Sequence, residues 1–339
     1  MTRQEELKIA KKLKADEFYT QYEDIKKEIY PYFENDNDIF KNKVIFCPCD
    51  DYEKSNFTKF FMDNYNTFGI KKIICTSFEG VNSSKGKYFI YEKEHMESGF
   101  LKGDGDFRTD EVTKFRNEAD VVVTNPPFSL FKEFITWLFE ANKRFIILGN
   151  VNAISYKETF LHIKNNELWL GHSIHSGDRE FAVPNDYPLN ASTYRTNADG
   201  QNFIRVKGVR WFTNIDHAKF PPQLKLMSMK DNLTYNTSLI KKLNKDYGTN
   251  QYPYYDNYKA LEIPLSNAIP SDYDDVMGVP ITFLDKYNPK QFCIVGWSRH
   301  NDLNMDGGYW EEGTCNDAMI NKKAVYRRIL IKKINPFIY

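Results

Sequence analysis

The residues best suited to chemistry form a short polar turn that follows an apolar run. Residues 120–124 read Asp-Val-Val-Val-Thr, which predicts a buried β-strand, and Asn125, Pro126, Pro127 and Phe128 come directly after it. Asn-Pro-Pro-aromatic is a rare combination at average amino-acid usage. In open α/β sheets, ligands bind beyond the carboxyl ends of the strands. This turn is therefore the first candidate for a catalytic loop.

The four residues suit the activation of an exocyclic amine on a planar base. The lone pair of such an amine is delocalised into the ring, so acceptors must hold both hydrogens to favour a more tetrahedral nitrogen. The side-chain oxygen of Asn125 and the carbonyl oxygen of Pro126 are two such acceptors. The prolines fix φ and remove N–H donors, and Phe128 offers a face for stacking. The alternative is a strand-ending turn with a buried Phe128.

The strand before Asn125 belongs to an alternating pattern of strands and helices. Apolar, β-rich runs predict strands near residues 43–47, 72–76, 120–124 and 144–148. Helical spacing predicts helices over residues 54–64, 109–117 and 129–141, preceded by an amphipathic helix over residues 2–30 that Pro31 ends. This alternation predicts a doubly wound α/β sheet with ligands at the carboxyl ends of its strands.

Beyond about residue 170 the alternation gives way to Gly-, Pro-, Asn-, Ser- and Tyr-rich sequence with short strand-like pieces at 202–206 and 208–212. The whole chain of 339 residues has 46 basic and 46 acidic residues, so bulk charge predicts no polyanionic partner. Residues 201–230, however, contain six basic residues, one acidic residue and interleaved aromatics. That local pattern is typical of nucleic-acid binding, and the alternative is an ordinary solvated surface around a buried Trp.

Targeting segments and metal sites are not indicated. The charged N-terminal segment does not resemble a signal peptide, and no apolar run approaches the ~20 residues that span a bilayer, which predicts a cytoplasmic protein without membrane contact. Cys47 and Cys49 do not have zinc-site spacing, and the five cysteines are predicted to be reduced. His172 and His175 have the spacing of a metal pair without a third ligand nearby, so no metal is predicted.

The Asn125–Phe128 turn resembles the catalytic loop of amino-group methyltransferases that use S-adenosylmethionine, and Phe in fourth place resembles the adenine-N6 branch. Further segments resemble the EcoRI-type adenine-specific DNA methyltransferases: residues 44–51 with 55–57, residues 211–214 and residues 277–284. The resemblance covers about residues 40–335.

This resemblance implies a Rossmann-like class I methyltransferase sheet with an added DNA target-recognition region. The expected domains are an N-terminal helix (1–30), a catalytic domain that binds S-adenosylmethionine (31–170), a target-recognition region (171–260) and a C-terminal segment that packs back on the catalytic domain (261–339). The expected substrate is a flipped adenine within a short specific site of duplex DNA. The resemblance also implies a monomer that serves restriction-modification or phage or host DNA protection, and it allows for a cognate restriction endonuclease that acts separately.

Cofactor contacts follow from position, because the glycine-rich turn of most such enzymes is absent. The resemblance assigns them to Cys47, Pro48, Asp50, Asp51, Ser77, Asp106, Phe107 and Asn125. Asp50 or Asp51 is expected to meet the methionine ammonium group; alternatively, Asp50 and Glu53 form a capping box. Asp106 is expected to accept the amino group of the cofactor's adenine while Phe107 stacks on it; alternatively, this segment is only a glycine-rich turn.

Predicted DNA contacts are Phe181, Arg205, Lys207, Arg210 and Trp211, with Phe181 or Trp211 holding a flipped base against Phe128. Both rings are also ordinary core candidates. Two other functions remain open. The same loop can present an adenine of RNA or a glutamine amide of a protein to the cofactor, and a non-catalytic DNA-binding protein can keep the fold.

Overall fold

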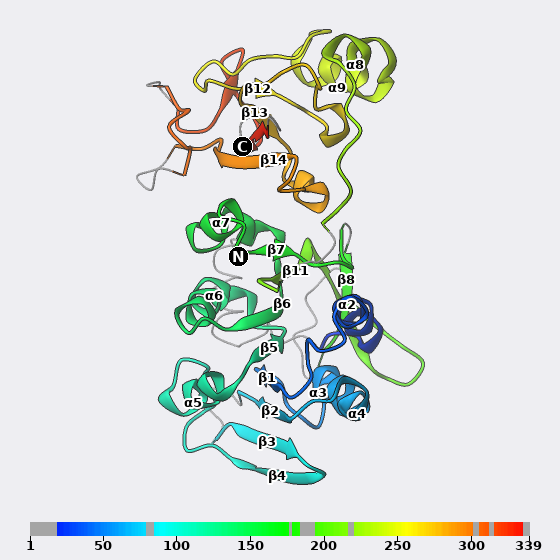
Figure 1. The fold of residues 1–339 in the computed structure, drawn as a ribbon, viewed down its shortest axis with the longest axis vertical. Helices are drawn as coiled ribbons and strands as arrows, with labels where there is room; N and C mark the ends of the chain where they lie inside the picture. Colours follow the sequence, from blue (N-terminus) through cyan, green and yellow to red (C-terminus); the bar gives the residue numbers. More distant parts are fainter. Residues whose placement is uncertain are drawn as a thin grey trace. The chain divides into compact units, whose positions relative to one another are not determined.

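The structure is a computed structural model that describes residues 19–78, 85–175, 178–183, 194–215, 220–300, 305–311 and 315–334. The chain divides into two compact units (Figure 1). The first unit comprises residues 1–159 and 168–216, and the second comprises residues 160–167 and 217–339. None of the described helices is both long enough and apolar enough to cross a membrane.

The first unit is built on an eight-stranded sheet with the order β4-β3-β2-β1-β5-β6-β11-β7. The strands are β1 (Val44–Pro48), β2 (Lys72–Thr76), β3 (Lys87–Glu92), β4 (His95–Phe100), β5 (Val121–Thr124), β6 (Arg144–Asn150), β7 (Trp169–Leu170) and β11 (Val209–Thr213). The four central strands, β2, β1, β5 and β6, are parallel, whereas the strands on both flanks are antiparallel. The four strands predicted from the sequence are confirmed as this parallel centre.

Helices cover both faces of the sheet, as expected for strands whose two faces are apolar. They are α2 (Tyr22–Asn35), α3 (Asn56–Asp63) and α4 (Tyr65–Phe68) on one face, and α5 (Asp110–Glu118) and α6 (Phe131–Glu140) on the other (Figure 1). Phe60 of α3 and Phe68 of α4 share a buried cluster with Ile45 of β1. On the opposite face, Phe46 packs against Phe115 of α5. The predicted α/β class and the helices at 54–64, 109–117 and 129–141 are confirmed.

The prediction that Pro31 ends the first helix is wrong, because Pro31 lies inside α2. One missing N–H removes one backbone hydrogen bond, and burial of Ile29 and Tyr32 on the adjoining turns holds the helix together. Tyr19, which the prediction also placed in this helix, instead pairs with Ala182. Residues 2–18 lie outside the described part of the chain.

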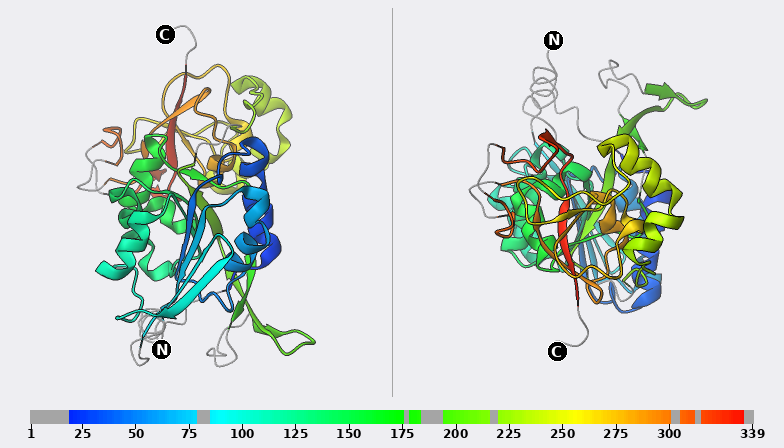
Figure 2. Two further views of the ribbon diagram at one scale, coloured as in Figure 1. Left: turned by 60° about the horizontal axis from the view of Figure 1, so that its bottom comes forward. Right: turned by 90° about the horizontal axis from the view of Figure 1, so that it is seen from above.

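A smaller antiparallel sheet of the first unit has the order β8-β10-β9 and consists of β8 (Asp178–Val183), β9 (Tyr194–Thr196) and β10 (Asn202–Lys207). Figure 2 shows these strands, in green, extending away from the main sheet. Phe181 and Ile204 on one face belong to the buried cluster of the first unit. Because side chains alternate along a strand, the other face of this sheet carries Glu180, Phe203 and Arg205.

In its described residues the second unit contains a sheet with the order β12-β13-β17-β14, the hairpin β15-β16 and the helices α8 and α9. The elements are β12 (Leu261–Glu262), β13 (Met277–Val279), β14 (Phe292–Trp297), β15 (Met319–Ile320), β16 (Lys323–Ala324), β17 (Ile329–Lys333), α8 (Met229–Tyr235) and α9 (Thr237–Tyr247). Helix α7 (Lys157–Lys164) begins in the first unit and ends in the second, and short 3-10 turns are η1 (Phe128–Leu130), η2 (Val151–Ser155), η3 (Ser266–Ala268) and η4 (Ile281–Lys286).

The two units do not follow the boundaries expected at residues 170 and 260. Strand β11 pairs with β6 and completes the main sheet, so residues 168–216 belong to the first unit. Residues 217–260 belong to the second unit. The segment 171–260 is therefore not one compact region, and its role in DNA recognition stays a prediction.

Candidate active site

Between the carboxyl ends of β1 and β5 the order in which the chain adds strands to the sheet reverses. From β1 the chain passes to β2 on one side, and it later returns to β5 on the other side. Such a switch point is where doubly wound sheets bind ligands. The hydroxyl of Thr124, the last residue of β5, contacts the carbonyl oxygen of Pro48 and lies 2.6 Å from Asp50 Oδ2. The two loops are thus joined directly.

Asp50 is a buried carboxyl group at this junction. Burial raises the pKa of Asp50 to about 7, and the negative charge of Asp51 adds to the rise, although hydrogen bonds from Ser55 and Thr124 oppose it. The hydroxyl of Thr124 has one hydrogen but faces two acceptors, Pro48 O and Asp50 Oδ2. If Asp50 is protonated, its own hydrogen can be donated to the Thr124 hydroxyl, which then donates to Pro48, so that both contacts are hydrogen bonds. No Lys or Arg of the described residues forms an ion pair with Asp50. A buried carboxyl of this kind suits a ligand that carries positive charge.

We expect Asp50→Asn to stabilise the protein at pH 8 and to have little effect at pH 4. The pKa of Asp50 rises from its ordinary 3.8 to about 7, so the folded state keeps a proton that the unfolded chain loses. The free energy of unfolding therefore falls as pH rises from about 4 to about 7, and asparagine removes this loss. Urea denaturation at both pH values measures it. Equal effects at the two pH values would contradict the assignment.

The alternative in which Asp50 caps a helix is wrong. The N-cap of α3 is Ser55, whose hydroxyl oxygen accepts hydrogen bonds from the amides of Phe57 and Thr58. The same hydroxyl donates to Asp50 Oδ1 at 2.6 Å. Asp51, by contrast, lies 3.5 Å from the ammonium of Lys87. Of the two acids, Asp50 is the one without a basic partner in the described structure.

The turn after β1 is made without glycine. Cys49 has φ +64°, in the left-handed region that glycine usually occupies, and so reverses the chain toward Asp50. Cys47 is fully buried in the core cluster with Ile45 and Ile73. The thiol of Cys47 therefore faces the core, and the cofactor contact predicted at Cys47 stays a prediction that only its backbone could make. Pro48 meets Thr124 through its carbonyl oxygen.

The predicted catalytic loop leads from β5 into α6. Pro126 is buried, and the carbonyl of Pro127 accepts a hydrogen bond from the amide of Leu130 at 2.9 Å, which begins the short turn η1. Phe128 is half-buried and packs against the core cluster of the first unit. Asn125 is one residue from Thr124, and its side-chain oxygen is shielded from solvent. The loop thus places Asn125 beside the junction that holds Asp50.

A second junction brings Ser77, after β2, to the segment around Gly105. Gly105 has φ +87°, and a Cβ at this position would overlap the carbonyl oxygen of Ser77. The amide of Gly86 donates to the carbonyl of Gly103 at 2.9 Å, and the Ser77 hydroxyl oxygen accepts from the amide of Lys87. The glycine-rich segment therefore has a structural role, and it places Asp106 at the same edge of the sheet as Ser77.

We expect Gly105→Ala to destabilise the first unit by at least about 1 kcal/mol, because the added Cβ meets a backbone atom and the left-handed conformation disfavours alanine. Gly103→Ala is the matched control, since nothing lies within 4 Å of a Cβ there. Hydrogen exchange in β2 and β3 measures the difference. Equal loss of protection in both variants would contradict a specific contact with Ser77.

The expectation that Phe107 stacks on an adenine is contradicted. Phe107 is buried between two rings of α6, with centroids 5.0 Å from Phe134 and 5.4 Å from Trp137. Both contacts are edge-to-face, so the ring belongs to the core. The carboxylate of Asp106 accepts from Arg108 at 2.9 and 2.5 Å. A cofactor contact at Asp106 stays a prediction and would have to displace this exposed arginine.

Three of the five predicted DNA contacts lie in the interior. Phe181 and Trp211 belong to the core cluster and are 2% and 1% exposed, so neither can stack on a flipped base in this structure. Arg210 is buried, and its guanidinium donates to the carbonyl oxygens of Val209 and His175. Arg205 and Lys207 are exposed on β10 and remain predicted DNA contacts.

Several site-forming residues escaped the sequence analysis. Thr124 and Ser55 both form hydrogen bonds with Asp50. The sequence feature that could have identified them is a hydroxyl residue at the end of an apolar strand or at the start of a helix. Glu28 of α2 is fully buried and accepts hydrogen bonds from the backbone of His172 and from Ser173. The sequence feature that could have identified Glu28 is an acidic residue within the apolar helix face that contains Ile29. These bonds position the segment that also contains His175.

The family described as "Adenine-specific methyltransferase EcoRI" matches residues 6–334. The chain is 39% identical to the Type II methyltransferase M.EcoRI of Escherichia coli over 95% of this chain and 94% of that protein. It is 36% identical to M.MgeORF184P of Mycoplasma genitalium and 35% identical to M.MpnI of Mycoplasma pneumoniae, both Type II methyltransferases, over 96% of this chain and 97% of each.

Proposed function

The chain belongs to the EcoRI family of adenine-specific methyltransferases, and from this membership we propose that it is a site-specific DNA methyltransferase acting on N6 of adenine. S-adenosylmethionine is the proposed methyl donor and duplex DNA the proposed substrate. The observation that carries the proposal is the position of Asn125. It follows Thr124 at the carboxyl end of β5, and Thr124 contacts Asp50 in the neighbouring loop after β1.

The residues after β1 and β2 fit a cationic cofactor. Asp50 is a buried carboxyl without a basic partner in the described structure, at the point where such sheets bind ligands. Asp50, with Asp51 and Ser77 at the same edge, would hold S-adenosylmethionine, and Asp50 would favour its positive charge. When bound, this cofactor supplies a methyl group on a positively charged sulfur atom.

The loop after β5 would hold the target base. The side-chain oxygen of Asn125 and the carbonyl oxygen of Pro126 would accept the two hydrogens of the adenine amine, and Phe128 would stack on the ring. An adenine inside a duplex cannot reach such a loop, so the base must first be flipped out of the helix. Positioning by these residues then supplies most of the rate enhancement.

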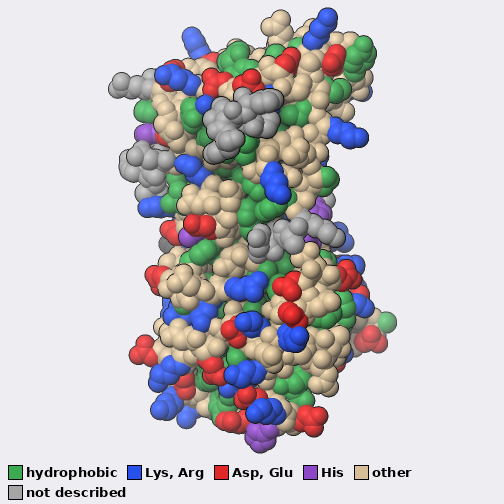
Figure 3. Space-filling view, viewed as in Figure 1, with side chains coloured by type: hydrophobic (Ala, Val, Ile, Leu, Met, Phe, Trp, Pro, Cys, Tyr) green, Lys and Arg blue, Asp and Glu red, His purple; other side chains and the backbone are tan. Residues whose placement is uncertain are grey.

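DNA binding would depend on local rather than total charge. Figure 3 shows acidic and basic side chains interspersed over the viewed face of each unit, in keeping with a net charge of zero. Arg205 and Lys207 are exposed on β10 and are proposed to contact the DNA. We further propose that the enzyme acts as a monomer within a restriction-modification or DNA-protection system, with any cognate endonuclease a separate protein.

Radiolabelled S-adenosylmethionine tests the substrate class. The enzyme is incubated separately with duplex DNA, structured RNA and a protein mixture, and labelled nucleosides are separated after digestion. We expect label in N6-methyladenine from duplex DNA. Label in RNA adenine or in glutamine would assign a different acceptor. Absence of transfer to all three, with retained DNA binding, would favour a non-catalytic binding protein and overturn the proposal.

A further inference from the structure

The outward face of the three-stranded sheet holds a small polar cluster. In the register of β8, β10 and β9, Arg205 lies opposite Glu180, and Phe203 lies opposite Arg195. Residues paired directly across strands share a face, and so do residues two apart in one strand. Glu180, Arg195, Phe203 and Arg205 therefore share one face, which we call the Arg195 face. The opposite face carries the buried Phe181 and Ile204.

Arg195 is held in a fixed orientation on this face. Its Nε and Nη2 atoms donate to the two carboxylate oxygens of Glu180 at 2.9 and 2.7 Å. The centre of the guanidinium lies 4.7 Å from the centroid of the Phe203 ring. A guanidinium has five N–H groups, and Glu180 takes two of them from the side. The end of the fork, with one N–H on each terminal nitrogen, stays available on a side chain that is 52% exposed.

The Arg195 face starts at the same edge of the main sheet as the catalytic loop. The side chain of Asn150, at the carboxyl end of β6, donates to the carbonyl of Lys207 at the end of β10. Strand β6 is parallel to β5 and adjacent to it, so this carboxyl end is also the edge where Asn125 lies. The sheet extends outward from there (Figure 2). A duplex whose adenine reaches Asn125 must pass close to this edge.

We propose that Arg195 reads a guanine in the major groove of the DNA site, with Glu180 and Phe203 as positioning residues. This inference rests on the proposed function. A β-ribbon fits the major groove, and guanine offers O6 and N7 as two acceptors to an arginine fork. The Glu180 carboxylate lies beside the Arg195 fork and 3.8 Å from Arg205, so it offsets part of the positive charge that would attract a phosphate group, whereas a base edge is uncharged. A guanidinium already fixed by Glu180 and Phe203 loses little rotamer freedom on binding.

The test uses the duplex sequence that the full-length protein methylates, with 7-deazaguanine, which lacks the N7 acceptor, replacing one guanine at a time. Binding is measured by fluorescence anisotropy without cofactor. We expect one such replacement to weaken wild-type binding about tenfold or more. Arg195→Lys, which keeps the charge and loses the fork, should weaken binding to unmodified DNA by a similar factor and be insensitive to that replacement. Glu180→Gln should weaken binding less and keep the sensitivity.

Asp38→Asn is the matched control, because Asp38 and Lys41 form an exposed ion pair before β1, at the opposite edge of the sheet. It should not change binding. A site without guanine, or wild-type binding insensitive to every replacement, overturns the inference. If Arg195→Lys weakens binding to all DNA sequences equally, Arg195 contacts a phosphate group rather than a base, and the inference is overturned. If the wild-type protein neither binds nor methylates any duplex, the proposed function itself fails.

Discussion

Asn125→Ala should lower the rate of methyl transfer by about a hundredfold to a thousandfold, the usual effect of removing one hydrogen-bonding group that stabilises a transition state. Asn125 supplies one of the two acceptors proposed for the adenine amine, and the other, the carbonyl of Pro126, remains in the variant. Asn125 is only one of the expected cofactor contacts and those after β1 and β2 are unchanged, so binding of S-adenosylmethionine should stay within about threefold of wild type. Single-turnover transfer of labelled methyl groups to duplex DNA measures the rate.

Asn37→Ala provides the control for this experiment. Asn37 is an exposed asparagine in a turn before β1, at the amino edge of the sheet. Its replacement should leave the transfer rate unchanged, so a loss confined to Asn125→Ala cannot come from a general effect of removing an amide. Full activity of the Asn125→Ala variant would refute the assignment of the catalytic loop.

The local parts of this site could be predicted from the sequence because their signals are contiguous. The β-branched run before Asn125 predicts a strand at 120–124, and the structure has β5 at Val121–Thr124. The helix expected at 109–117 is α5, and its N-cap is Thr109. Such elements are specified by a few neighbouring residues, namely a run of Val or a hydroxyl before a helix. Strand, turn and helix are therefore all found around the candidate catalytic loop.

Contacts between distant residues could not be predicted in this way. Thr124 and Asp50 are 74 residues apart, and only the strand order makes β1 and β5 neighbours. Burial is likewise a property of the assembled fold. Phe107 and Trp211 are aromatic residues near basic or glycine-rich sequence, which suits a binding site equally well, yet packing places both in the core. The proposed catalytic role thus follows from sequence, and the surroundings of Asp50 follow from tertiary structure.

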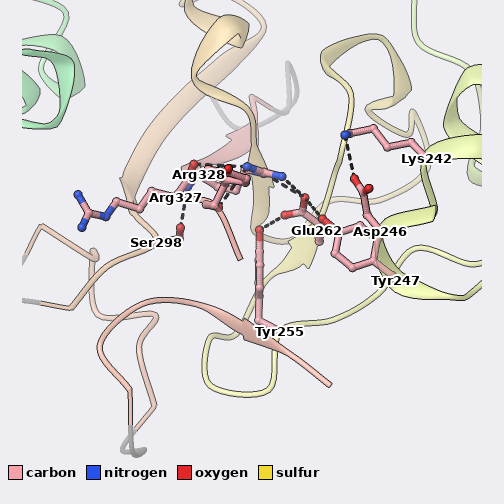
Figure 4. Close-up of polar contacts among 9 residues, drawn as sticks. Lys242, Asp246, Tyr247, Tyr255, Glu262, Ser298, Arg327 and Arg328 are labelled. Atoms are coloured by element: carbon pink, nitrogen blue, oxygen red, sulfur yellow. Dashed lines mark hydrogen bonds and ion pairs between the residues drawn. The ribbon is translucent and has the colours of Figure 1, made fainter. Parts of the chain in front are cut away.

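Glu262 and Arg328 are the centre of a buried charge network in the second unit (Figure 4). Glu262 of β12 is fully buried, and Arg328 donates to its Oε1 atom from Nε at 3.0 Å and from Nη2 at 2.7 Å. The hydroxyls of Tyr247 and Tyr255 also donate to this carboxylate. Burial and the charge of Glu262 raise the pKa of Tyr255. The network joins α9 and β12 to the chain just before β17.

Glu262→Ala should destabilise the second unit by about 3–5 kcal/mol, because it leaves Arg328 buried without its counter-charge. Replacing both partners, as Glu262→Leu with Arg328→Met, should recover most of this loss, since no uncompensated charge then remains. Urea unfolding followed by hydrogen exchange in β12 and β17 reports on this unit separately from the first. A double variant no more stable than Glu262→Ala would show that the loss does not come from the unpaired charge.

Asp246→Ala tests whether the stability lost in Glu262→Ala comes from the burial of the charge or from the loss of any ion pair. Asp246 pairs with Lys242 at 2.8 Å on α9, next to Tyr247, and both side chains are about one-third exposed (Figure 4). Solvent screens such a pair, and i,i+4 pairs on helices contribute only about 0.3–0.5 kcal/mol. We therefore expect a loss several times smaller than for Glu262→Ala in the same hydrogen-exchange experiment. Losses of equal size would mean that the burial of Glu262 does not determine its contribution to stability.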